Sequence, residues 1–123
     1  MKLLAEENIE IENTKVYLAL FKLYKSYLLL ISDQEDLGIG NVTLSSPPII
    51  NGIKSPTTSY NLFGVKSNLL STIIAERASS ALNAPILLLL FLKDEINNEK
   101  MIKPIINFLN QILNQILEKT NKT

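Results

Sequence analysis

The sequence contains no cysteine, no histidine and no tryptophan. Without cysteine there are no thiolate nucleophiles and no disulfides, and without cysteine or histidine the usual zinc sites cannot form. Catalytic triads that depend on histidine are excluded for the same reason. The nucleophiles that remain are serine, threonine and lysine, with no visible base beside them. We therefore expect a protein that is not an enzyme and that needs no metal and no cofactor.

The chain also lacks an excess of charge and a long apolar run. Acidic and basic residues number twelve each, and the lysines are scattered, so no basic surface for nucleic acid or an anionic membrane is predicted. The longest apolar run has eight residues from Pro85, whereas a membrane-spanning helix needs about 20. Two glutamates follow the first five residues, which is untypical of a secretory signal. We expect a cytoplasmic or nuclear protein.

The length of 123 residues predicts a single domain over 1–123. We expect residues 1–7 and 119–123 to be loose. From Ile9 the chain becomes strand-like, and a hairpin is predicted with strands over 16–23 and 27–32. A helix over 15–31 is the alternative, because leucine and alanine favour helices, but the aromatic and β-branched residues favour the hairpin.

Two further strands are predicted over 39–44 and 58–63. The loop between them, 46–57, is longer than the usual connection of about 4–6 residues, which is typical of a loop used for contact. The acidic segment 33–36 lacks the ligand spacing of a calcium loop, and we interpret it as a solvated turn.

A helix is predicted from Ser67, a natural N-cap, to the residues before Pro85, which cannot continue it. An uninterrupted apolar strand follows over 86–92. The last helix is expected to begin at about Asn98 or Lys103 and to end near residue 118, with Pro104 in its opening turn.

This order of elements predicts an α+β fold, a mainly antiparallel sheet with two helices packed on one face. The strands over 16–23, 27–32 and 86–92 are apolar on both sides, and two helices cover only one face of a small sheet. We therefore expect the other face to be used for dimerisation. By alternation, Tyr17, Phe21 and Leu29 are candidates for the dimer interface.

Arg77 is the only arginine in the sequence, and helical spacing places it beside Ile73 and Ile74. One interpretation is that its stem covers core surface while its guanidinium reaches a carboxylate or solvent. The other is that Arg77 contacts a partner protein, because arginine is enriched at interfaces.

Four segments together resemble the proteasome assembly chaperone 4 family: 58–64 (TSYNLFG), 69–70 (LL), 73–77 (IIAER) and 83–88 (NAPILL). The resemblance extends in layout over about 14–117 and in residue detail over 58–92. The related proteasome assembly chaperone 3 is the alternative within this group.

The resemblance implies a non-catalytic chaperone. Members of this family pair through their sheets with a related subunit, and the pair binds an α-type subunit of the 20S proteasome and supports assembly of the α ring. A heterodimer is expected, with a homodimer as the alternative. Arg77 and the loop residues Ile50 and Ile53 are the candidate contacts with the proteasome subunit.

Two other functions compete with this one. A small dimeric scaffold of the roadblock or longin type, which organises GTPases, would begin with a helix before the first hairpin, and residues 1–13 give such a helix little support. An enzyme that uses serine or lysine would need a deep polar pocket.

Overall fold

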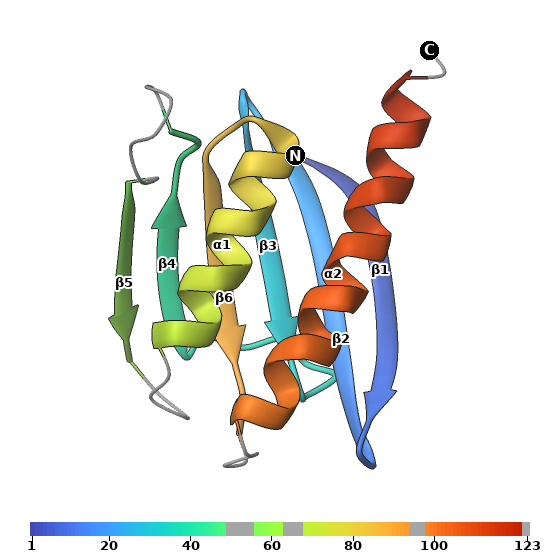
Figure 1. Ribbon diagram of the computed structural model, residues 1–123, viewed down its shortest axis with the longest axis vertical. Coiled ribbons are helices and arrows are strands. Elements are labelled where there is room, and N and C mark those ends of the chain that lie inside the picture. The colour runs from blue at the N-terminus through green and yellow to red at the C-terminus, as the bar shows by residue number, and fades with distance from the viewer. Residues whose placement is uncertain (49–55, 63–67, 94–97, 122–123) are drawn as a thin grey trace.

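Six strands form one sheet in the order β1-β2-β3-β6-β4-β5 (Figure 1). A computed structural model describes residues 1–48, 56–62, 68–93 and 98–121. The strands are β1 (Lys2–Ile11), β2 (Thr14–Leu23), β3 (Ser26–Ser32), β4 (Asn41–Ser45), β5 (Thr57–Asn61) and β6 (Ile86–Phe91), and the helices are α1 (Asn68–Leu82) and α2 (Asn98–Asn121). β3 and β6 are parallel and the other neighbours are antiparallel. The predicted α+β class is confirmed.

The predicted hairpin is formed by β2 and β3, which pair from Tyr17 with Ser32 to Leu23 with Ser26. A second hairpin, which was not predicted, joins β1 to β2. Its turn residues Glu12 and Asn13 have φ of 47° and 67°. Two consecutive left-handed residues are typical of the type I′ turn, whose twist matches that of the flanking strands.

The prediction that residues 1–7 are loose is wrong. β1 pairs with β2 from Lys2 to Ile11, with an irregularity between Leu3 and Ala5. Several of its side chains are exposed glutamates, so the apolar alternation that marks a strand is interrupted. Charges and an irregularity are also how an edge strand avoids pairing with other chains. At the other end of the chain, α2 continues to Asn121, beyond the predicted end.

α1 ends where the sequence predicts. Asn83 adopts a φ of 50°, and the N–H of Ala84 donates to the carbonyl of Ser79 at 3.2 Å. This is the Schellman arrangement that terminates many helices. Ser67, the predicted N-cap, lies outside the described residues.

The prediction for Pro104 is wrong, because α2 begins at Asn98 and Pro104 lies inside the helix. A proline at this point removes the N–H that the carbonyl of Lys100 would otherwise accept. The strand predicted over 39–44 is shifted and begins at Asn41, and the one predicted over 58–63 begins at Thr57.

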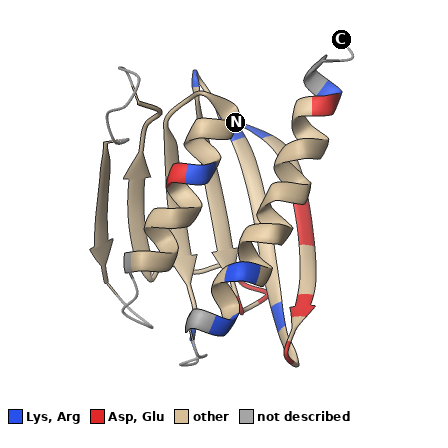
Figure 2. Cartoon of the chain, viewed as in Figure 1, with Lys and Arg blue, Asp and Glu red and all other residues tan. Residues whose placement is uncertain are grey.

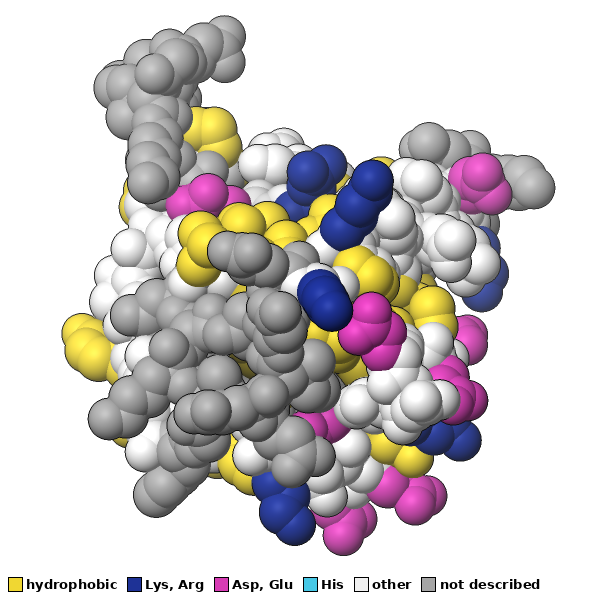
Figure 3. Space-filling model, turned by 60° about the horizontal axis from the view of Figure 1, so that its bottom comes forward, with side chains coloured by type: hydrophobic (Ala, Val, Ile, Leu, Met, Phe, Trp, Pro, Cys, Tyr) yellow, Lys and Arg dark blue, Asp and Glu magenta, His cyan; other side chains and the backbone are white. Residues whose placement is uncertain are grey.

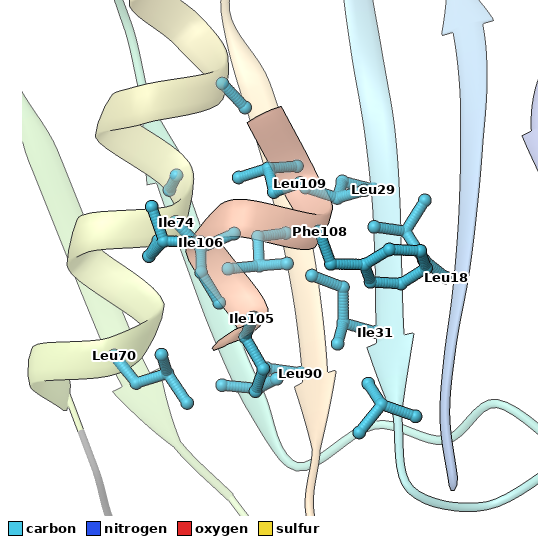
Figure 4. Close-up of a cluster of buried hydrophobic side chains, with 14 of the residues drawn as sticks. Leu18, Leu29, Ile31, Leu70, Ile74, Leu90, Ile105, Ile106, Phe108 and Leu109 are labelled. Atoms are coloured by element: carbon cyan, nitrogen blue, oxygen red, sulfur yellow. The ribbon is translucent and has the colours of Figure 1, made fainter. Parts of the chain in front are cut away.

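Both helices lie on the same face of the sheet (Figure 1), as predicted. α1 packs on β4, β5 and β6, and α2 packs on α1 and β1. Between the layers lies a core of aliphatic side chains (Figure 4). Its fully buried members from the sheet include Leu18, Leu29, Ile31 and Leu88, and those from the helices include Leu70, Ile74, Ile105 and Leu109.

Candidate functional site

The face of the sheet turned away from the helices carries an apolar surface, which we call the open face. Its position follows from the strict alternation of burial in β6, where Ile86, Leu88 and Leu90 are buried against the helices and the residues between them point the other way. Paired residues on neighbouring strands point to the same face of the sheet. The strand pairing therefore assigns the residues of the other five strands to one face or the other. The apolar side chains of the open face are Leu3, Tyr17, Ala19, Phe21, Leu23, Leu28, Leu30, Val42, Leu44, Tyr60, Leu87, Leu89 and Phe91.

One apolar row crosses five strands of this face without interruption. Ala19 is opposite Leu30, Leu30 is opposite Leu89, Leu89 is opposite Val42, and Val42 is opposite Tyr60. Cross-strand neighbours of this kind touch, so the row is a continuous apolar band.

A second row runs beside the first, from Leu3 through Phe21, Leu28 and Leu87 to Leu44. In the centre the leucines shield one another and are half-buried, whereas Leu44 is 54% exposed. Tyr60, at the end of the first row, is 63% exposed. The β4–β5 side of the open face is therefore its most accessible part.

The segment between β3 and β4 closes one end of the open face. A Cβ added to Gly38 would lie 3.3 Å from Cγ of Phe91, so a larger residue at this position would require the ring to shift by a few tenths of an ångström. The carboxylate of Asp33 accepts the N–H of Lys93 at 3.0 Å, and the N–H of Asp33 donates to the carbonyl of Phe91 at 3.3 Å. The acidic turn predicted over 33–36 thus also holds the end of β6.

Apart from Leu3, the β1 side of the open face is polar. Glu6, Asn8 and Glu10 share this face with their β2 partners, and the ammonium of Lys15 lies 5.8 Å from the centre of the Tyr17 ring. The charged flank and the closed end leave the apolar rows, apart from the nearly buried Ala19, as the surface that a partner could contact.

Two of the three predicted interface residues lie on the open face, where Tyr17 and Phe21 are half-buried. The assignment of Leu29 has to be corrected, because it is fully buried among the core residues beneath α2 (Figure 4). Every position of β3 from Tyr27 to Ile31 is apolar, so the sequence does not indicate which residues face outwards. Leu28 and Leu30 occupy the open face in its place.

Arg77 also departs from its predicted position. It is exposed, and the buried side of α1 is formed instead by Leu70, Ile74 and Ala78, which follow one another at intervals of four residues. Ile50 and Ile53, the other candidate contacts, lie outside the described residues.

Sequence reasoning missed most of the open face, above all Leu87 and Leu89 of β6 and Val42 and Leu44 of β4. A usable signal was present for β6, which is apolar at every position and therefore has to be covered on both faces. For β4 the signal is weaker, because its helix-facing residues are polar.

The described residues offer little that is typical of a catalytic centre. Two hollows have volumes of about 170 and 240 Å³, smaller than the roughly 300–1,000 Å³ of most ligand pockets. In the described part of the chain, no three acidic side chains gather closely enough to hold a metal ion. No helix in that part is both long and apolar enough to cross a membrane.

Charge is distributed over both ends of the molecule. Acidic residues are spaced along β1, and basic residues occur near the start of α2 (Figure 2). Seen from the end of the molecule in Figure 3, basic, acidic and apolar side chains of the described residues are interspersed. Among the described surfaces, the open face is therefore the strongest candidate for a protein interface.

The sequence matches no family model and no curated protein. The structure, in contrast, is similar to a chain from a chaperone complex for yeast 20S proteasome assembly, with a TM-score of 0.59 and 12% sequence identity. The alignment covers 91% of this chain and 97% of the yeast chain. At this identity the likeness establishes a common fold, which extends over nearly the whole of both chains.

Proposed function

We propose that this protein is a non-catalytic chaperone that acts in 20S proteasome assembly as one member of a dimer. The observation that carries the proposal is the apolar row across five strands of the open face, in a chain that shares its fold with a component of a proteasome assembly chaperone complex. The resemblance of segments 58–64, 69–70, 73–77 and 83–88 to assembly chaperones supports the same function.

The partner on the open face is a second sheet. Apolar area gains about 25 cal/mol per Å² when it leaves water, and a surface of this extent is rarely left uncovered on a soluble protein. The surface consists of paired strands whose side chains form flat rows, and this shape matches another sheet packed about 10 Å away. A related subunit with a similar face would form a heterodimer, and a second copy of this chain would form a homodimer.

The client of the dimer is an α-type subunit of the 20S proteasome, and the complex is cytoplasmic or nuclear. Arg77 is our candidate for this contact, because it is exposed on the helix side and a dimer formed through the sheets would leave it accessible. The dimer therefore presents its helices to the client and keeps its sheets for the partner.

The test is an affinity pull-down from native extract with two leucine variants of similar exposure. Leu44 lies on the open face and is 54% exposed, whereas Leu69 lies on α1 and is 62% exposed. We expect the wild-type chain to recover a partner subunit and proteasome α subunits, and Leu69→Asp, which changes the helix side and not the open face, still to recover the partner subunit. Leu44→Asp should recover neither, because it places a carboxylate in the apolar row.

Recovery of the same proteins by Leu44→Asp and the wild type would contradict the role of the open face. Recovery of GTPases in place of proteasome subunits would instead establish the alternative, a roadblock-like or longin-like scaffold. The helix with which that scaffold would begin is replaced here by the strand β1, which favours the chaperone.

A further inference from the structure

β1 is one of the two edge strands of the sheet. Among the described residues, its backbone is hydrogen-bonded only to that of β2. The outer side of an edge strand carries a row of backbone N–H and C=O groups that can pair with a further strand. The irregularity of β1 lies between Leu3 and Ala5, and from Glu6 to Ile11 the register with β2 is regular. This second part of the edge therefore has the geometry that a further strand needs.

The turn after β1 determines which residues face the free edge. In its type I′ conformation, Ile11 and Thr14 flank the turn as a hydrogen-bonded pair of the ladder. Hydrogen-bonded and non-hydrogen-bonded pairs alternate along antiparallel strands. The backbone N–H and C=O groups of Glu6, Asn8 and Glu10 therefore point away from β2.

A hollow of about 240 Å³ lies beside this edge, between β1 and α2. The two elements contact each other and lie side by side at one edge of the sheet (Figure 1). The apolar residues that line the hollow are Ile9, Phe108 and Ile112, and the polar ones are Glu7, Asn8, Gln111 and Gln115. A hollow of this size is small for most ligands, but it can receive an apolar side chain from a strand added to β1.

The same edge is acidic (Figure 2). Glu6 and Glu10 are exposed on the open face, and Glu7 is exposed beside the hollow. Opposite charges on neighbouring strands stabilise their pairing, whereas like charges destabilise it. A second copy of β1 would place glutamates next to glutamates, and an acidic segment would do the same. The charges that protect this edge from most chains therefore favour a basic one.

We propose that β1 binds an extended basic segment of a partner protein as a seventh strand of the sheet. Side chains alternate between the two faces of a strand, so basic side chains of the segment lie beside Glu6 and Glu10. The apolar side chains between them enter the hollow next to Phe108. In this mode of recognition the backbone hydrogen bonds supply affinity and the pockets supply specificity. The surface is separate from the apolar rows on which the proposed dimer depends.

The probe for this site is a short fluorescent peptide in which lysine and valine alternate, blocked at both ends. Its binding to the full chain is measured by fluorescence anisotropy. The matched control peptide has the same side chains but a methyl group on every peptide nitrogen, so it keeps the charge and loses the backbone donors. We expect the control to bind at least about tenfold more weakly, and a peptide with glutamate in place of lysine to do the same. Equal binding of the probe and either control, or no binding of the probe, would overturn the proposal.

Amide hydrogen exchange followed residue by residue by NMR locates the bound peptide. At saturating peptide, exchange at Glu6, Asn8 and Glu10 should slow by about tenfold or more, because their N–H groups become hydrogen-bonded. Exchange at Glu7 and Ile9 should change less, since their N–H groups already face β2. Protection that does not alternate in this way would overturn the proposal.

Variants of the edge give a further test. Asn8→Pro removes one outward N–H, and proline is tolerated in an edge strand where its nitrogen faces solvent. It should weaken binding of the probe by about fivefold or more. Binding as tight as that of the wild type would contradict the proposal, and the methylated peptide tests the same backbone bonds without a variant.

Charge is tested with two variants that raise the net charge by the same amount. Glu7→Gln should weaken binding of the probe by about threefold, because it removes a carboxylate beside the hollow. Ser80→Lys changes an exposed residue of α1 and should leave binding unchanged. Equal effects would show an attraction that depends on net charge alone, which overturns the proposal. Leu44→Asp should bind the probe like the wild type, and a loss of binding would place the peptide on the apolar rows instead.

Discussion

The two faces of the sheet differ in what covers them, and Leu29 and Leu30 show the difference most simply. These adjacent leucines belong to the same strand, yet Leu29 is fully buried beneath α2 and Leu30 is half-buried on the open face. On one face the chain supplies its own cover. On the other face two apolar rows are not covered by either helix. The composition of a strand therefore shows how much apolar surface it carries, but not which element covers each face.

The largest effect is expected from Leu29→Ala, which should lower the free energy of unfolding by about 2–5 kcal/mol because it leaves a cavity in the core. Leu30→Ala should cost the isolated chain less than about 1.5 kcal/mol, since the surroundings of a half-buried side chain are already open to water. Urea denaturation of both variants measures the contrast. Equal losses would mean that the two faces are equally covered in the isolated chain.

Substitutions at exposed positions of the open face should affect dimer formation more than the stability of the isolated chain. Leu44→Ala and Tyr60→Ala should each weaken dimer formation by about 1–2 kcal/mol, because both side chains are exposed at the accessible end of the apolar rows. Their free energies of unfolding should change by less than about 0.5 kcal/mol. Sedimentation equilibrium gives the first quantity and urea denaturation the second, and unchanged association would place the interface elsewhere.

The covered face is not uniformly apolar, and Thr43→Val tests that part of it. Valine keeps the shape of the side chain but removes the hydroxyl that donates to Asn41. We expect a loss of about 1 kcal/mol in the free energy of unfolding, measured by thermal denaturation with Thr58→Val, an exposed threonine of β5, as the control. A gain in stability would show that the buried network costs more than it contributes.

The smallest effect concerns neither face. Asn83 has a φ of 50° at the end of α1, and Asn83→Gly should stabilise the chain by about 0.5 kcal/mol because glycine adopts this conformation more easily. Dimer formation should be unchanged. A change in association would indicate that the end of α1 contributes to the interface.

The sequence predicted the elements whose periodicity is clear. The hairpin of β2 and β3, the helix before Pro85 and the apolar strand after it were all found, because tertiary packing and local pattern agree there. β1 was missed because its exposed glutamates break the alternation. The start of α2 was left open between two positions because Pro104 is unusual inside a helix.

The candidate site was predicted in outline but not in its residues. The excess of apolar strands indicated an uncovered face, and Tyr17 and Phe21 lie on it. Leu29 was assigned to the wrong face because consecutive leucines do not indicate which of them points to which face of the sheet. The pairing of Leu29 with Leu20 determines its face. Arg77 was placed too close to the core because small or apolar residues occur on nearly every side of α1, so its buried side is hard to identify from the sequence.

The parallel pairing of β3 with β6 has a consequence for the synthesis of the chain. β6 is the last strand to leave the ribosome, yet it lies between β3 and β4 at the centre of the sheet. Until it emerges, neither the N-terminal strands nor the β4–β5 hairpin can join the other. Contacts so distant in sequence form slowly, so a nascent chain that pauses before Ile86 exposes the whole edge of β3 to its neighbours.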